Sequence, residues 1–206
     1  LLRFRYLFAA IVAPLLLVGW FVYCMSIGSR LTLGLSANLM TFLVGWHYVK
    51  QGYGLLIVDS VLKRSFFDAR GKDLLLVNAY AVWALSWLQV NRVVGDGDFW
   101  GMEVYAFSIP DWLFYVSVAV AAGTSIAAFK VLGAKLMRPQ SGGDRPIAGA
   151  VAYVTSLYVW IVATRPVIWL VIPAFHSLQY LVVEWKYRLH KERQGASATA
   201  RLQAAR

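Results

Sequence analysis

Residues 111–133 read DWLFYVSVAVAAGTSIAAFKVLG, an almost uninterrupted run of apolar and small side chains. A helix that crosses the roughly 30 Å hydrocarbon core of a bilayer needs about 20 such residues. The run therefore predicts a membrane-spanning helix that begins near Asp111. This acidic residue follows Pro110 and suits the N-terminus of a helix, as a cap or as a partner of the helix dipole.

Five further apolar runs accompany this one along the chain. The six runs are 4–26, 32–58, 73–94, 111–133, 147–164 and 166–185. Polar or helix-breaking joints separate them, and the last joint is the pair Arg165-Pro166. The sequence is 60% hydrophobic with a mean hydropathy of +0.60, whereas soluble domains are roughly 45–50% apolar. We expect an all-α integral membrane bundle of about six transmembrane helices over residues 1–190, followed by a basic cytoplasmic tail over 191–206.

Lysine and arginine are concentrated in alternate joints, which predicts the orientation. Short cytoplasmic loops retain these residues preferentially. The basic joints and ends contain Arg3, Arg5, Lys63, Arg64, Arg70, Lys72, Lys130, Lys135, Arg138, Arg145, Lys186, Arg188, Lys191 and Arg193. The alternate joints contain only Arg30, Arg92 and Arg165. The asymmetry predicts an even number of spans with the N-terminus and the C-terminus in the cytoplasm.

The formal net charge of +10 comes from the same lysine and arginine residues of the basic joints and ends. The basic residues are spread over four short segments rather than gathered on one folded face, so they do not indicate nucleic acid binding. Attraction to anionic head groups explains them better. We therefore expect membrane lipids as partners and no nucleic acid.

Small residues recur at four-residue spacing on two of the predicted helices, and this spacing permits close helix packing. They are Ser117, Ala121 and Ser125, then Ala119, Gly123 and Ala127, and on the next run Ala148, Ala152 and Ser156. The pattern predicts contacts between helices, including one at Gly123, and no chemistry.

His47 and His176 are the leading candidates for a functional site, because ionisable side chains are costly inside the hydrocarbon. At about 1.5 Å per residue, His47 lies roughly 26 Å after Arg30, and His176 roughly 17 Å after Arg165. Both helices are expected to run from the outside to the inside. The two histidines should therefore lie at comparable depths within the membrane.

Each histidine also has polar companions on its own helix face. Gln51 follows His47 by four residues, and Gln179 and Tyr180 follow His176 by three and four residues. Such groups can fix the tautomer and the orientation of an imidazole. We expect one shared pocket in which the histidines are the metal or haem ligands. In the alternative interpretation, the two histidines only pack helices together and hydrogen-bond to these neighbours.

Two nearby features of the 32–58 run leave alternatives open. Lys50 can pair with a carboxylate, extend to the interface or form part of the site. A straight helix from the start of this run to Lys63 would measure roughly 50 Å, longer than a bilayer core. Either an inner extension or a break at Gly52 and Gly54 is therefore expected.

The two histidine segments resemble those of a group of bacterial polytopic membrane proteins of unknown function. Residues 46–54 read WHYVKQGYG and residues 176–181 read HSLQYL. The group carries an aromatic-flanked His-Tyr in one helix and His-Ser/Asn-x-Gln-Tyr in the last. This resemblance implies a multi-pass protein of the bacterial inner membrane and implies no activity.

Several classes of chemistry are excluded by the residues. Three histidines are too few for the eight-histidine membrane di-iron enzymes, and acidic clusters for two-metal phosphotransfer are lacking. The chain has no phosphate-binding glycine loop and no G-x-S-x-G motif. Cys24 is the single cysteine, so it has no disulfide partner in the chain, and we expect it to pack in a helix.

Three functions remain, and the sequence does not decide whether the protein is an enzyme. In the first, His47 and His176 hold a haem or a single metal ion in redox chemistry. In the second, the chain is a non-catalytic subunit or assembly factor bound to other membrane subunits. The third is a small transporter, which would need discontinuous helices, with breaks near Gly52 and Pro173.

Overall fold

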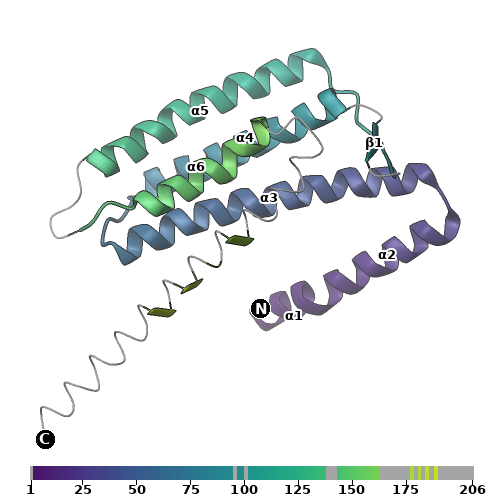
Figure 1. Ribbon diagram of the computed structural model, residues 1–206, viewed down its shortest axis with the longest axis horizontal. Coiled ribbons are helices and arrows are strands. Elements are labelled where there is room, and N and C mark those ends of the chain that lie inside the picture. The colour runs from purple at the N-terminus through teal and green to yellow at the C-terminus, as the bar shows by residue number, and fades with distance from the viewer. Residues whose placement is uncertain are drawn as a thin grey trace, which may run out of the picture.

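The computed structural model describes residues 2–94, 97–99, 102–137 and 143–162, together with positions 177, 178, 181, 184, 185, 188 and 189. Over these residues the chain is almost entirely helical (Figure 1). Four helices pack side by side as a bundle, and the N-terminal helix extends away from it.

The N-terminal helix is continuous and has three parts, α1 (Leu2–Leu7), the π-helical turn η1 (Phe8–Val12) and α2 (Ala13–Ile27). The bundle consists of α3 (Arg30–Leu62), α4 (Ala69–Val94), α5 (Asp111–Met137) and α6 (Ile147–Val162). These segments confirm a helix in each of the first five predicted runs. The run 166–185 lies outside the described residues, apart from positions 177, 178, 181, 184 and 185.

A short antiparallel hairpin connects α4 to α5, and the sequence patterns did not predict it. Its strands are β1 (Gly97–Phe99) and β2 (Met102–Val104), with Asp98 opposite Glu103. Strands of three residues carry little apolar alternation, so they leave a weak sequence signal. The hairpin sits at one end of α3 (Figure 1).

Three described helices are long and apolar enough to cross a membrane, namely Ala10–Ile27, Ala69–Arg92 and α5. The shorter α6 is also apolar. Helix α3 has 33 residues but is not among the three, and polar residues in its middle explain its lower hydropathy. The described residues thus indicate a helical membrane protein, while the count of six spans stays a prediction.

Helix α3 is unbroken through Gly52 and Gly54, so the expected break does not occur and the helix is extended instead. Gly52 serves contact with α6, because a Cβ at this position would lie 2.6 Å from the Cβ of Ser156. A Cβ on Gly149 of α6 would lie 2.8 Å from the Cα of Leu56. These contacts confirm close packing at the small-residue face of α6.

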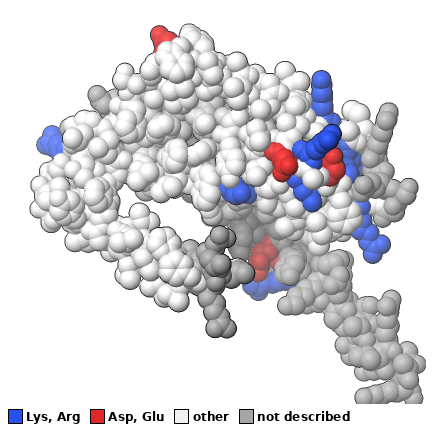
Figure 2. All heavy atoms as spheres, turned by 180° about the vertical axis from the view of Figure 1, so that it is seen from behind, with Lys and Arg blue, Asp and Glu red and all other residues white. Residues whose placement is uncertain are grey.

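The joints between helices alternate between two ends of the bundle, as predicted. At one end the α3–α4 joint meets the α5–α6 joint, where the Asp144 amide donates to the Lys63 carbonyl at 2.9 Å. The Lys63 ammonium donates in turn to the Arg145 carbonyl at 3.0 Å. Figure 2 shows charged side chains gathered around this end. Which end faces the cytoplasm stays a prediction.

The two small-residue faces of α5 have different surroundings. Ala121 and Ala128 are buried in the core that α5 shares with α4 and α6. Gly123 is exposed, and a Cβ at this position would meet open space. The expected helix contact at Gly123 is therefore wrong for the part of the chain that the structure describes.

Candidate functional site

The buried amide of Asn78 connects three helices through a complete set of hydrogen bonds. Its Nδ2 donates to the hydroxyls of Tyr153 at 2.9 Å and Tyr158 at 3.4 Å, and its Oδ1 accepts from Ser125 Oγ at 3.1 Å. The Tyr153 hydroxyl donates to the Leu75 carbonyl, and that of Tyr158 donates to Ser125 Oγ, both at 2.7 Å. Because every member has partners, this network stabilises the bundle and offers no group to a ligand.

A second satisfied amide cluster joins α3 and α4, near the hairpin, to the chain after the hairpin. Asn38 Nδ2 donates to Asn91 Oδ1 at 2.6 Å and to the Tyr105 carbonyl at 2.8 Å. Asn38 Oδ1 accepts from the Trp87 indole at 2.9 Å, and Asn91 Oδ1 also accepts from the Phe107 amide. These bonds fix the loop geometry, so we assign this cluster to the fold as well.

His47 lies on the side of α3 that faces away from the bundle. Gly45 contacts α4 and Gly52 contacts α6. At 100° per residue, His47 is about 160° around the helix from Gly45 and about 140° from Gly52. Its side chain is exposed, and its ring centroid is 5.9 Å from that of Tyr48. The imidazole therefore points away from the described helix bundle.

Gln51 follows one turn after His47 and has a buried Nε2 with no hydrogen-bond partner. Leaving such a donor unsatisfied costs about 1–3 kcal/mol. Among the described residues, Ser65 Oγ and Trp160 Nε1 are also buried without a partner. Gln51 differs from these two because it shares a helix face with a histidine near the middle of a 33-residue helix.

Lys50 is held by aromatic rings. Its ammonium lies 5.6 Å from the ring centroid of Tyr80 on α4 and 5.9 Å from that of Tyr53. Cation–π contacts of this kind stabilise a charge in an apolar region. Gly54, four residues after Lys50, has open space where a Cβ would be. The face around His47 therefore combines polar groups with free volume.

The N-terminal helix contacts this same face of α3. Ser36 precedes His47 by eleven residues, which is close to three turns, and its Oγ accepts a bond from the Trp20 indole at 2.8 Å. Cys24 is buried against Ser36, with Sγ and Oγ 3.8 Å apart, which confirms its predicted packing role. Beyond these contacts the N-terminal helix diverges, and Figure 2 shows an open gap between it and the bundle.

The π-helical turn of the N-terminal helix falls at about the depth of His47. Helices α2 and α3 are antiparallel neighbours, and Trp20 lies beside Ser36. His47 is eleven residues after Ser36, so the same depth on the N-terminal helix is eleven residues before Trp20, within η1. Pro14 follows this turn and has no N–H to donate, which accounts for the wider hydrogen-bonding pattern. Single π-turns in helices often occur at functional sites.

Two of the five predicted site residues lie in the described part of the chain, and they share one face of α3, as predicted. They are His47 and Gln51. His176, Gln179 and Tyr180 lie outside the described residues. Within the described ranges, no group of three or more histidine, cysteine, aspartate or glutamate side chains could hold a metal ion.

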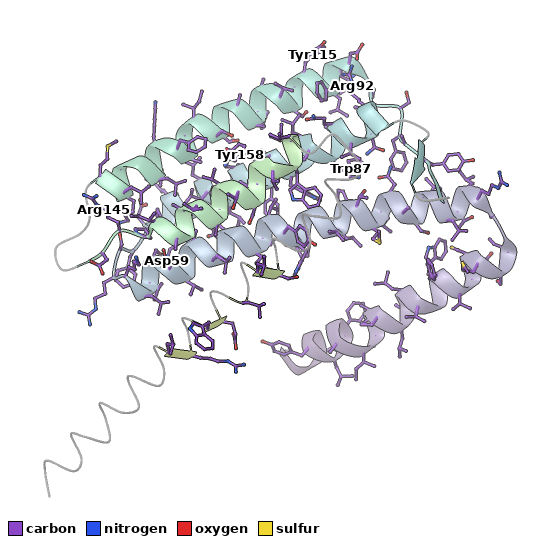
Figure 3. All side chains as sticks on the ribbon, viewed as in Figure 1. Asp59, Trp87, Arg92, Tyr115, Arg145 and Tyr158 are labelled. Carbon is purple, nitrogen blue, oxygen red and sulfur yellow. The ribbon has the colours of Figure 1, made fainter. Side chains whose placement is uncertain are left out.

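Sequence reasoning missed the buried amides Asn38, Asn78 and Asn91, although the cost of polar groups in hydrocarbon applies to them as it does to histidine. It also missed the cap at the start of α6, where Asp59 Oδ2 accepts from the Gly149 amide at 2.8 Å (Figure 3). The first four N–H groups of every helix need acceptors from outside the helix. The carboxylate of Asp59 could therefore have been predicted to cap another helix.

The fold and this face define a helical membrane protein with a polar surface on the middle of α3. No protein-family model, curated protein or solved structure matches the chain.

Proposed function

We propose that the chain is a multi-pass protein of the bacterial inner membrane that binds a redox cofactor on the His47 face of α3. In this proposal six helices cross the membrane and both termini are cytoplasmic. His47 and His176 are the two ligands of a haem or of a single metal ion. Gln51, Gln179 and Tyr180 surround the ligands and orient them.

The observation that carries the proposal is the buried, unpartnered Nε2 of Gln51 beside His47. A bound group that accepts a hydrogen bond, such as a haem propionate or a metal-bound water, would remove the desolvation cost of this donor. The exposed imidazole of His47 is one turn away, within reach of the same bound group. Asn78 and Asn38 have no comparable unsatisfied donor, because their side-chain amides form hydrogen bonds within the fold.

The end of α6 supports a position of the last apolar run beside α3. Trp160, two residues before the end of α6, packs against Tyr48 of α3 in a tilted arrangement, with ring centroids 5.4 Å apart. The Lys/Arg bias predicts that the following run returns to the inner side, parallel to α3. The run 166–185 would thus start next to α3, near Tyr48.

Two imidazoles from neighbouring helices are sufficient axial ligands for a haem. A single metal ion would need a further ligand, for which Tyr180, a glutamine or another molecule is required. In either case Gln51 and Gln179 act as positioning residues. Electron transfer is the chemistry that a site with these ligands supports most directly.

Visible absorption and metal analysis of the purified full-length protein test this function. We expect a haem spectrum or about one metal ion per chain, lost in His47→Ala and in His176→Ala. His190→Ala is the matched control and should keep the signal, because His190 lies in the basic segment after the last predicted run. Wild-type protein without either signal, produced in cells supplied with haem and metals, would overturn the proposal.

A subunit of a larger membrane complex is the second candidate function. Only 6% of the residues in the apolar stretch Ala10–Ile27 are buried within the described structure. It leaves a long apolar surface that another membrane subunit could cover. Native mass spectrometry of the gently solubilised protein distinguishes the candidates, since a stable partner at fixed stoichiometry favours the subunit. The small transporter is the weakest of the three candidates, because α3 is continuous.

A further inference from the structure

A groove of about 350 Å³ runs between α5 and α6, in the half of the bundle next to the α5–α6 joint. Its walls include Phe129, Leu132, Gly133 and Leu136 of α5, with Ala150 and Val154 of α6. Ligand pockets in proteins measure roughly 300–1,000 Å³, so the groove has room for one slender molecule.

One end of the groove lies beside an aromatic contact, and its walls are apolar. The ring of Phe129 stacks on Tyr158, with centroids 5.6 Å apart and an angle of 22° between the planes. The Thr155 hydroxyl donates to the Val151 carbonyl at 2.9 Å, so it is turned back to its own helix. At Gly133 a Cβ would meet open space. The occupant must therefore be apolar where it lies inside the groove.

Positive charge lies at the end of the groove next to the α5–α6 joint. Arg145 precedes Ile147 of the groove wall by two residues, and its side chain is exposed. The nearby carboxylate of Asp59 lies on the opposite face of α6, bonded to the Gly149 amide. A long arginine side chain can extend to the head-group region while its charge stays in water.

We propose that this groove binds one acyl chain of an anionic phospholipid, whose phosphate pairs with Arg145. The wall from Phe129 to Leu136 is roughly 10 Å long, which suits the part of a chain nearest the head group. The proposal rests on the membrane location in the proposed function. It is independent of the cofactor, so loss of the haem or metal leaves the lipid prediction standing.

Native mass spectrometry of the full-length protein tests the groove. The protein is titrated with phosphatidylglycerol and with phosphatidylcholine of identical acyl chains. We expect one phosphatidylglycerol per chain, bound at least five-fold more tightly than phosphatidylcholine. Gly133→Leu, which fills the groove, should weaken binding at least ten-fold. Gly123→Leu is the matched control on the same helix, because its site is equally open but lies outside the groove.

Charge variants test the head-group contact without altering the groove wall. Arg145→Gln should weaken phosphatidylglycerol binding about five-fold and leave phosphatidylcholine binding unchanged. Arg70→Gln, an exposed charge at the start of α4, is the control and should have no effect. Equal affinity for the two lipids, equal losses at Gly123 and Gly133, or a lipid-free dimer would each overturn the proposal. The charge variants still decide the question if Gly133→Leu does not fold.

Discussion

Asn78 and Gln51 are both amides inside apolar helices of the bundle, but they differ in what surrounds them. Asn78 is fully buried and has partners for its Nδ2 and its Oδ1 on two neighbouring helices. Gln51 has a buried Nε2 with no partner. Buried polar groups in proteins are almost always satisfied, so an exception requires a reason. The satisfied amide belongs to the fold, and the unsatisfied one marks the proposed site.

The same contrast divides α3 into two sides. The side with Gly45 and Gly52 packs closely against α4 and α6. The side with His47 and Gly54 faces away from them and retains free volume. Polar residues on the unpacked side of a membrane helix lose hydration, which costs free energy. A bound cofactor would offset this cost.

Asn78→Leu should have the largest effect on stability. The substitution removes the acceptor of Ser125 and the donor to both tyrosine hydroxyls, so we expect the free energy of unfolding to fall by about 1–3 kcal/mol. Titration of the detergent-solubilised protein with sodium dodecyl sulfate measures it. An unchanged midpoint would mean that the network is not structural.

Gln51→Leu should act in the opposite direction in cofactor-free protein. It removes a buried donor without a partner, so we expect stability to rise by about 1 kcal/mol. The same variant should bind the proposed cofactor more weakly. Destabilisation of the cofactor-free variant to the extent seen for Asn78→Leu would contradict the distinction between the two amides.

Tyr158→Phe tests the edge of the Asn78 network. The Tyr158 hydroxyl makes one short bond to Ser125 Oγ and a long contact to Asn78. Hydrogen bonds between membrane helices contribute about 0.6 kcal/mol on average, and we expect a loss of that size in the same titration. A loss as large as that of Asn78→Leu would place the centre of the network at the tyrosine.

Gly123→Leu should have the smallest effect of the four. The site is open, so no helix is displaced, and leucine is the better helix former. We expect at most a slight gain of roughly 0.5 kcal/mol, measured by the same titration. A clear loss would show that this face of α5 contacts another helix after all.

The fold was largely predictable because runs of apolar residues report membrane helices directly. The runs 4–26, 32–58, 73–94 and 111–133 each became a helix within four residues of the expected ends. The faces of those helices were less predictable, since the spacing of small residues does not reveal which side meets a neighbour. Gly123 shows this limit. Its four-residue spacing is the same as that of the buried Ala121 and the half-buried Ser125, but Gly123 lies outside the core.

The candidate site was predictable only in part. The cost of burying an imidazole identified His47, and helical spacing identified Gln51 as its companion. Whether a buried amide finds a partner depends on distant residues, as Asn78 does on Tyr153, seventy-five positions away. Such pairings arise from tertiary packing, so the sequence alone did not separate structural amides from functional ones.

The distance between the His47 face and the last apolar run tests the central claim most directly. Spin labels at Leu43→Cys and Ile172→Cys, each four residues before a histidine, leave both imidazoles intact in a Cys24→Ser background. Helix axes in contact lie roughly 8–10 Å apart, so with a cofactor between the helices we predict a label separation below about 25 Å by pulsed electron paramagnetic resonance. A separation above about 35 Å would place the histidines on different sides of the bundle and contradict the shared site.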